Sequence, residues 1–284
     1  MRLEDMRRSS NVEDRRGMPV GRRGAGIGIG TIVLLVAGYF LGVSPSTMLS
    51  MIGAGETVTQ GAAGAAGAVG APTDPQVDFA AAVLGETEDV WTNYFAATGQ
   101  RYAPPTLVLF SGEVASACGV AGAAAGPFYC PGDQQLYIDL DFFRQLSTEF
   151  AAPGEFARAY VLAHEVGHHI QHLLGLSGRS EQVAARRNEA GARRVSVAIE
   201  LQADCLAGVW AMRDQRVIEP GEVQQALAAA AAVGDDTLQR RMQGRVVPET
   251  FTHGTAEQRQ RWFQRGFDSG SIDSCDTYSA RSQL

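Results

Sequence analysis

The sequence predicts an α+β domain, mostly helical with a small sheet, preceded by one N-terminal transmembrane helix. Three observations carry this prediction. The stretch Ile27–Val43 is dense in apolar residues. Most of the chain after about Gln76 has the periodicity of helices. Two short apolar runs, Thr106–Phe110 and Gln135–Asp139, have the length and composition of strands.

The apolar stretch has the features of a membrane anchor. No charged residue occurs from Gly24 to Gly55, and about 20 apolar residues suffice to cross a bilayer core. The alternatives are a core helix, which is usually amphipathic, and a signal peptide, whose cleavage site the residues after Val43 lack. Residues 1–23 hold seven arginines against four acidic residues. This charge bias predicts a single-pass protein of the plasma or inner membrane with a cytoplasmic N-terminus and an extracytoplasmic domain.

Composition divides the chain into four segments. Residues 1–23 are expected to be a disordered cytoplasmic basic tail, and residues 24–43 the anchor. Residues 44–75 are rich in Gly and Ala and too poor in bulky side chains to build a core, so they are expected to be a flexible linker. The folded domain is then residues 76–284.

Charge and spacing also bear on partners. The chain carries −7, and because residues 1–23 carry +3, the rest carries −10. An acidic body lacks the clustered cations that phosphates require, so nucleic acid is not an expected partner. Gly38 and Gly42 in the anchor have the spacing that lets membrane helices pack closely, which leaves a homodimer open.

The four cysteines fit an exported domain. An even number in an oxidising compartment indicates two disulfides, and of the three connectivities we favour Cys118–Cys130 with Cys205–Cys275. Free buried thiols are the alternative. Neither pair has zinc-site spacing, so the cysteines are not expected to bind metal.

A metal-binding motif lies in a helix predicted over Phe156–Leu174. The sequence His164-Glu165-Val-Gly-His168 puts two imidazoles on one helical face, where both can bind one zinc ion. His168 and His172 have the same spacing but lack the intervening glutamate. The helix is otherwise strongly apolar, and buried histidines beside a buried glutamate cost free energy unless they are paired or metal-bound. A pair of solvated surface histidines is therefore the weaker interpretation.

A site with two histidines needs a third ligand, typically a carboxylate. Glu200 and Asp204 are four residues apart in a long helix predicted over about Glu181–Asp214, so both can face the same site. The longer Glu200 suits a ligand, and Asp204 suits a supporting acid that accepts the N–H of a ligating histidine. The reverse assignment stays open at this point.

These motifs resemble those of the bacterial neutral zinc metallopeptidase family. The resemblance rests on HEVGHHIQ, ELQADCLAGVW, GPFYCPGDQQLYIDLDFF and FTHGTAEQRQRWFQRG, and it covers about Gln76 to Cys275 together with the anchor and linker. The ELQAD element also resembles the ExxxD signature of gluzincin-type membrane peptidases, in which the glutamate is the third ligand. The resemblance implies a zincin-like fold, peptide hydrolysis, and Glu200 as a ligand of zinc with Asp204 in support.

The expected function is hydrolysis of a peptide or protein substrate by a water activated by one catalytic Zn²⁺, with Glu165 as general base. His253 is a candidate donor beside the oxyanion; its alternative role is to cap the last helix, predicted to begin at Thr255 with capping-box spacing. Two other functions stay open: a membrane-tethered zinc-binding scaffold or assembly protein without hydrolytic activity, and a zinc amidase acting on a cell-wall substrate. The natural substrate and the oligomeric state are not predicted.

Two smaller expectations concern the surroundings of the site. The strand Gln135–Asp139 is expected either at the edge of the cleft, where a peptide can pair with it, or inside the sheet. Asp235 and Asp236 are expected to cap a helix and not to form a second metal site.

Overall fold

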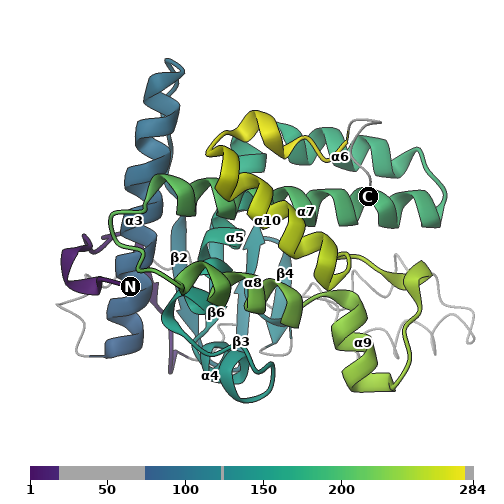
Figure 1. Ribbon diagram of the computed structural model, residues 1–284, viewed down its shortest axis with the longest axis horizontal. Coiled ribbons are helices and arrows are strands. Elements are labelled where there is room, and N and C mark those ends of the chain that lie inside the picture. The colour runs from purple at the N-terminus through teal and green to yellow at the C-terminus, as the bar shows by residue number, and fades with distance from the viewer. Residues whose placement is uncertain (19–73, 123–124, 279–284) are drawn as a thin grey trace, which may run out of the picture. The chain divides into compact units, whose positions relative to one another are not determined.

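The computed structural model describes residues 1–18, 74–122 and 125–278 (Figure 1). The predicted anchor and nearly all of the predicted linker lie outside these residues. The described residues form a mostly helical unit with a small sheet, which confirms the α+β class.

The elements follow one another in a simple order. The helices are α3 (Pro75–Ala97), α4 (Asp141–Thr148), α5 (Glu155–Leu173), α6 (Leu176–Ala185), α7 (Glu189–Arg213), α8 (Glu222–Ala232), α9 (Asp235–Gln243) and α10 (Ala256–Ser269). The strands are β1 (Val12–Asp14), β2 (Thr106–Phe110), β3 (Glu113–Ser116), β4 (Gly119–Gly122), β5 (Phe128–Cys130) and β6 (Gln135–Asp139). Short 3₁₀ turns lie at Leu3–Asp5, Pro248–Thr250 and Ile272–Cys275. Both predicted strands and the predicted motif helix are confirmed.

The main sheet has the strand order β1-β2-β6-β5. Strands β1, β2 and β6 are parallel, whereas β5 folds back through a turn and pairs antiparallel with β6. Strand β6 therefore lies inside the sheet, which is the second of the two positions considered for it from the sequence. The edge on that side is β5, which packs near α5.

Residues 1–18 do not form the disordered tail that was expected. They contain a 3₁₀ turn and strand β1, which pairs with β2 in the register Val12↔Leu107. Val12 is buried in the main core together with Leu107. The prediction of disorder failed because the segment is polar, and its order depends on a strand nearly 100 residues further along.

Helices α5, α7 and α10 form the core that positions the site. Gly167 of α5 permits a close approach to α7, since a Cβ at this position would lie 2.9 Å from the carbonyl oxygen of Ala203. Gly266 of α10 does the same on the other side of α7, where a Cβ would lie 1.9 Å from the carbonyl oxygen of Cys205. Larger side chains at either glycine would push these helices apart.

The long helix predicted over about Glu181–Asp214 is in fact two helices. Helix α6 ends at Ala185, and α7 begins after Asn188, whose side chain accepts a hydrogen bond from the backbone N–H of Gly191. This is an N-cap, which satisfies one of the unpaired donors at the start of a helix. Among the described residues, α7 alone is long and apolar enough to span a membrane, and most of it is buried inside the folded unit. It is accordingly a core helix.

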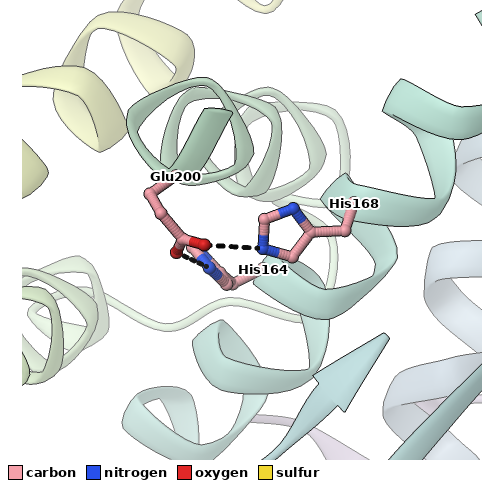
Figure 2. A group of neighbouring side chains, drawn as sticks. All are labelled: His164, His168 and Glu200. Atoms are coloured by element: carbon pink, nitrogen blue, oxygen red, sulfur yellow. Dashed lines mark hydrogen bonds and ion pairs between the residues drawn. The ribbon is translucent and has the colours of Figure 1, made fainter. Parts of the chain in front are cut away.

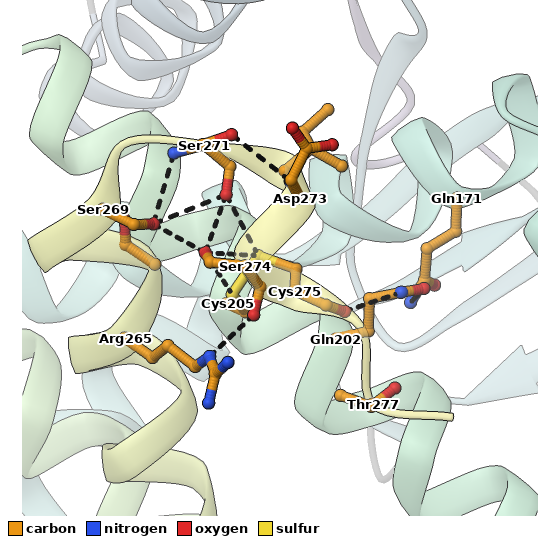
Figure 3. The surroundings of a disulfide bond; sticks show 12 residues. Gln171, Gln202, Cys205, Arg265, Ser269, Ser271, Asp273, Ser274, Cys275 and Thr277 are labelled. Atoms are coloured by element: carbon orange, nitrogen blue, oxygen red, sulfur yellow. Dashed lines mark hydrogen bonds between the residues drawn. A yellow bond between two sulfur atoms is a disulfide. The ribbon is translucent and has the colours of Figure 1, made fainter. Parts of the chain in front are cut away.

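Both predicted disulfides are confirmed. Cys118–Cys130 links the turn between β3 and β4 to β5. Cys205–Cys275 links α7 to the last 3₁₀ turn. Figure 3 shows this second disulfide with Gln202 beside it, donating a hydrogen bond to the backbone carbonyl of Cys275 at 2.9 Å. The disulfide therefore fixes the C-terminal segment directly against α7.

Candidate metal centre

Three side chains from two helices converge on one point. His164 and His168 extend from α5, and Glu200 extends from α7 (Figure 2). Their candidate ligand atoms all lie within 4.8 Å of one another. Nε2 of His164 is 3.2 Å from Oε2 of Glu200, and Nε2 of His168 is 3.6 Å from Oε1. Both imidazoles thus present the same ring nitrogen to one carboxylate.

The donor set fits a zinc ion. Zinc binds imidazole nitrogen and carboxylate oxygen at about 2.0–2.2 Å, so its ligands have to lie a few ångströms from one another. Two histidines and a glutamate leave a position for water or substrate, which is the arrangement of a catalytic site and not of a closed structural site. The described residues contain one such group of three metal-binding side chains, and it is the predicted one.

The other ring nitrogen of His164 is held by a buried acid. Nδ1 of His164 lies 2.8 Å from Oδ1 of Asp204, and Asp204 is fully buried. A carboxylate in this position fixes the tautomer and the orientation of a ligating histidine. Burial opposes a charge on His164, yet the Asp204 carboxylate raises the pKa of His164 to about 10.

Asp204 has strong partners of its own. Arg259 of α10 donates to Oδ2 from Nε at 2.8 Å and to Oδ1 from Nη2 at 2.9 Å, and the Tyr160 hydroxyl donates to Oδ1 as well. Burial alone would raise the pKa of Asp204, but the Arg259 guanidinium and then His164 lower it to about 2. The acid is thus kept ionised in a dry environment.

His168 is held by a different chain of hydrogen bonds. Its Nδ1 lies 2.9 Å from Oε1 of Gln171. Gln171 donates from Nε2 to the carbonyl oxygen of Ile199 at 2.7 Å and to Oε1 of Gln202 at 3.1 Å. Gln202 in turn donates to the Cys275 carbonyl beside the disulfide (Figure 3). Each ligating histidine therefore has its own support.

Glu200 is the carboxylate that faces both Nε2 atoms, whereas Asp204 faces Nδ1 of His164. Burial would raise the pKa of Glu200, but the His168 and His164 imidazoles lower it below its usual range. Of the two assignments considered from the sequence, this arrangement favours Glu200 as the ligand.

Glu165 and His253 line one cleft together with the three ligands. The cleft has a volume of about 570 Å³. Its walls are largely apolar and include Phe128, Phe142 and Phe150. Glu165 is 7% exposed, and within the described parts of the chain no side chain hydrogen bonds to its carboxylate.

His253 is held by Asp235. Nδ1 of His253 lies 3.1 Å from Oδ1 of Asp235, whose Oδ2 accepts from the backbone N–H groups of Thr252, His253 and Gly254. Asp235 thus orders the loop before α10. It is not the N-cap of α9 that the sequence predicts, because Gly234 occupies that position. The bond to Asp235 raises the pKa of His253, which burial opposes. The capping box of Thr255 and Gln258 starts α10 as predicted, without His253.

Sequence reasoning missed Tyr160, Gln171 and Arg259. Arg259 had a detectable signal, because it precedes the buried Trp262 and Phe263 by three and four residues and so lies on the apolar face of its helix. A charge in that position needs a buried partner. Gln171 and Tyr160 have no comparable signal.

Comparison with known proteins identifies the family of this chain. The family model described as "Putative neutral zinc metallopeptidase" matches residues 1–278. The uncharacterized protein YpfJ of Escherichia coli K12 is 44% identical over 291 residues, which cover 98% of this chain and 99% of the relative. The uncharacterized protein Rv2575 of Mycobacterium tuberculosis H37Rv is 50% identical over 192 residues, covering 63% of this chain and 64% of the relative. No solved structure matches the chain. The chain therefore belongs to the neutral zinc metallopeptidase family.

Proposed function

We propose that this protein hydrolyses peptide bonds with one zinc ion held by His164, His168 and Glu200. The observation that carries the proposal is the convergence of these three side chains, each imidazole being held from behind by its own buried partner. A bound zinc ion supplies a Lewis acid that activates water and polarises the carbonyl of the substrate. Hydrogen bonds that hold the histidine ligands, such as those to Asp204 and Gln171, are expected of a centre in which ligand orientation matters for chemistry.

Glu165 is the proposed general base. It directly follows a ligand, lines the same cleft, and has a carboxylate without a protein partner among the described residues. A carboxylate in this state can take a proton from water and then pass it to the leaving amine. A purely structural zinc site has no use for such a group, so Glu165 argues against a non-hydrolytic scaffold.

His253 is the proposed second catalytic residue. Asp235 contacts Nδ1, so Nε2 is the ring nitrogen that a substrate in the cleft can reach. A donor there would stabilise negative charge on the carbonyl oxygen of the substrate. Because the side chain is 49% exposed, it can reorient when substrate binds.

Strand β5 gives the cleft a place for an extended peptide. It is the edge strand of the main sheet, and its residues Phe128 and Tyr129 line the cleft. The free backbone groups of an edge strand can pair with a peptide, and neighbouring pockets can take its side chains. With Phe142 and Phe150 nearby, the cleft favours apolar substrate side chains.

The two disulfides support an oxidising, extracytoplasmic location for this unit. Membrane attachment through Ile27–Val43 stays a prediction from the sequence, as does a homodimer through that stretch.

The test of the metal centre is the zinc content of the full chain purified in detergent. The wild type is expected to hold about one zinc per chain, and His168→Ala to hold almost none. His172→Ala is the matched control, because His172 is one turn further along the same helix and outside the cluster. Equal zinc in the two variants, or none in the wild type, would rule out the proposed site.

A further inference from the structure

The N-terminal segment is part of the same folded unit as the metal centre. Strand β1 lies at the edge of the main sheet opposite β5. The backbone N–H of Leu107 donates to the carbonyl of Asn11, and the N–H of Arg15 donates to the carbonyl of Leu109, both at 2.8 Å. These are backbone hydrogen bonds of a parallel strand pair. The side chain of Val12, which lies in this strand, is 7% exposed.

Side chains reinforce the attachment to helix α3. Glu88 of α3 is buried, and it accepts hydrogen bonds from Ser9 Oγ at 2.6 Å and from Asn11 Nδ2 at 2.7 Å. Arg8 forms two hydrogen bonds to the Asp78 carboxylate. The fit is close, since a Cβ at Gly85 would lie 2.3 Å from the carbonyl oxygen of Arg7. A buried carboxylate such as Glu88 would lose its partners if the segment were elsewhere.

One ion pair joins the two ends of the intervening stretch. Nη1 of Arg16 lies 2.6 Å from Oδ2 of Asp74. Between them the chain runs through residues 19–73, which contain the apolar stretch Ile27–Val43. The two ends of this stretch therefore lie at one place on the folded unit.

This geometry conflicts with a single membrane crossing. A crossing would put residues 18 and 74 on opposite faces of a hydrocarbon core about 30 Å thick. An ion pair and a shared sheet cannot form across that distance.

The arginine bias of the N-terminal segment has another explanation in the fold. Five of its seven arginines lie among the described residues, and each pairs with an acid. The pairs are Arg2–Asp5, Arg7–Glu88, Arg8–Asp78, Arg15–Glu13 and Arg16–Asp14. Arg7, Arg8 and Arg16 thus connect the segment to acidic residues of 74–89, and their presence does not require a cytoplasmic location.

We infer that residues 1–18 and residues 74–278 lie on the same side of the membrane. The apolar stretch between them then does not carry the chain to the opposite side. The N-terminal strand shares the compartment of the catalytic cleft, contrary to the single-pass topology predicted from the charge bias. The inference does not depend on the metal or on hydrolysis.

The test is labelling of single introduced cysteines in the full chain, expressed in bacterial spheroplasts. Ser10→Cys and Gln100→Cys place a thiol at exposed positions in the N-terminal segment and after α3, and the four native cysteines are paired in disulfides. A membrane-impermeant maleimide is applied before and after lysis. Two controls are needed: labelling of both variants in detergent, to show that both thiols are reachable, and a cytoplasmic marker that stays unlabelled until lysis.

The expected result is that both positions respond alike, either both labelled in intact spheroplasts or both only after lysis. Labelling of one position in intact spheroplasts, with the other labelled only after lysis, would overturn the inference.

Discussion

The Arg259 guanidinium donates two hydrogen bonds to the Asp204 carboxylate, from Nε at 2.8 Å and from Nη2 at 2.9 Å. Both groups are buried, and they come from different helices, Arg259 from α10 and Asp204 from α7. Through Asp204, the last helix is connected to the imidazole of His164 on α5. The orientation of one metal ligand is thereby tied to the packing of three helices.

Removing Arg259 should destabilise the protein strongly. In Arg259→Gln the Asp204 carboxylate stays buried without its cation, and breaking such a pair costs about 3–5 kcal/mol. The free energy of unfolding in urea, measured on zinc-free protein, reports this cost. Arg240→Gln makes the same change at an exposed position of α9 and should alter stability by no more than about 0.5 kcal/mol. Similar values for both variants would show that the Arg259–Asp204 pair contributes no stability.

Gln171 should matter for zinc affinity more than for folding. In Gln171→Leu the Nδ1 of His168 loses its acceptor, and loss of such a partner typically weakens metal binding about 10–100-fold. Competition with a chromophoric chelator measures the affinity. An unchanged zinc affinity in Gln171→Leu would show that this contact does not orient His168.

Strand β1 should contribute to stability as an ordinary core strand. Val12→Ala removes two buried methyl groups and should cost about 1–3 kcal/mol in the free energy of unfolding. Val120→Ala is the matched control, since Val120 is 69% exposed. If Val12→Ala were as harmless as the control, the N-terminal strand would not be docked in solution.

Asp214 should make stability depend on pH. Burial, and then the neighbouring Glu86 carboxylate, raise the pKa of Asp214 from 3.8 to about 8. Between these values the unfolded carboxyl is ionised while the folded one keeps its proton. The folded state therefore binds more protons, so its stability falls as pH rises through this window and levels off above about pH 8.

Asp214→Asn should remove that slope. Urea unfolding at pH values from about 5 to about 9 compares the variant with the wild type, and Asp273→Asn is the control at an exposed aspartate. A wild-type slope that persists unchanged in Asp214→Asn would contradict the raised pKa.

The metal ligands were predictable because helical spacing is a local property. His164 and His168 share a face whatever the rest of the fold, and the same holds for Glu200 and Asp204. Which acid faces the histidines depends on how α7 crosses α5, and that crossing depends on contacts such as Gly167 against Ala203. Side-chain length and the family resemblance favoured Glu200 as the ligand, and only the packing shows which atoms it faces.

Strand β1 was not predictable on the same basis. Only three residues form the strand and two of them are acidic, so neither hydrophobicity nor length indicates it. The arginines before and after it had a second interpretation as a membrane topology signal. The acidic partners of Arg7 and Arg8, which are Glu88 and Asp78, lie about 70–80 residues away in sequence. Long-range pairs of this kind leave no local pattern.

Glu165 is proposed to be the general base of a zinc-dependent hydrolase. The direct measurement is cleavage of an unfolded protein such as casein by the full chain in detergent, with zinc content determined for the wild type and for Glu165→Gln. We expect about one zinc per chain in both, and cleavage that falls at least about 100-fold in the variant. Undiminished cleavage by a zinc-loaded Glu165→Gln variant would contradict it. Zinc-loaded wild-type protein that cleaves no peptide substrate would also count against it and would instead favour the scaffold or cell-wall amidase.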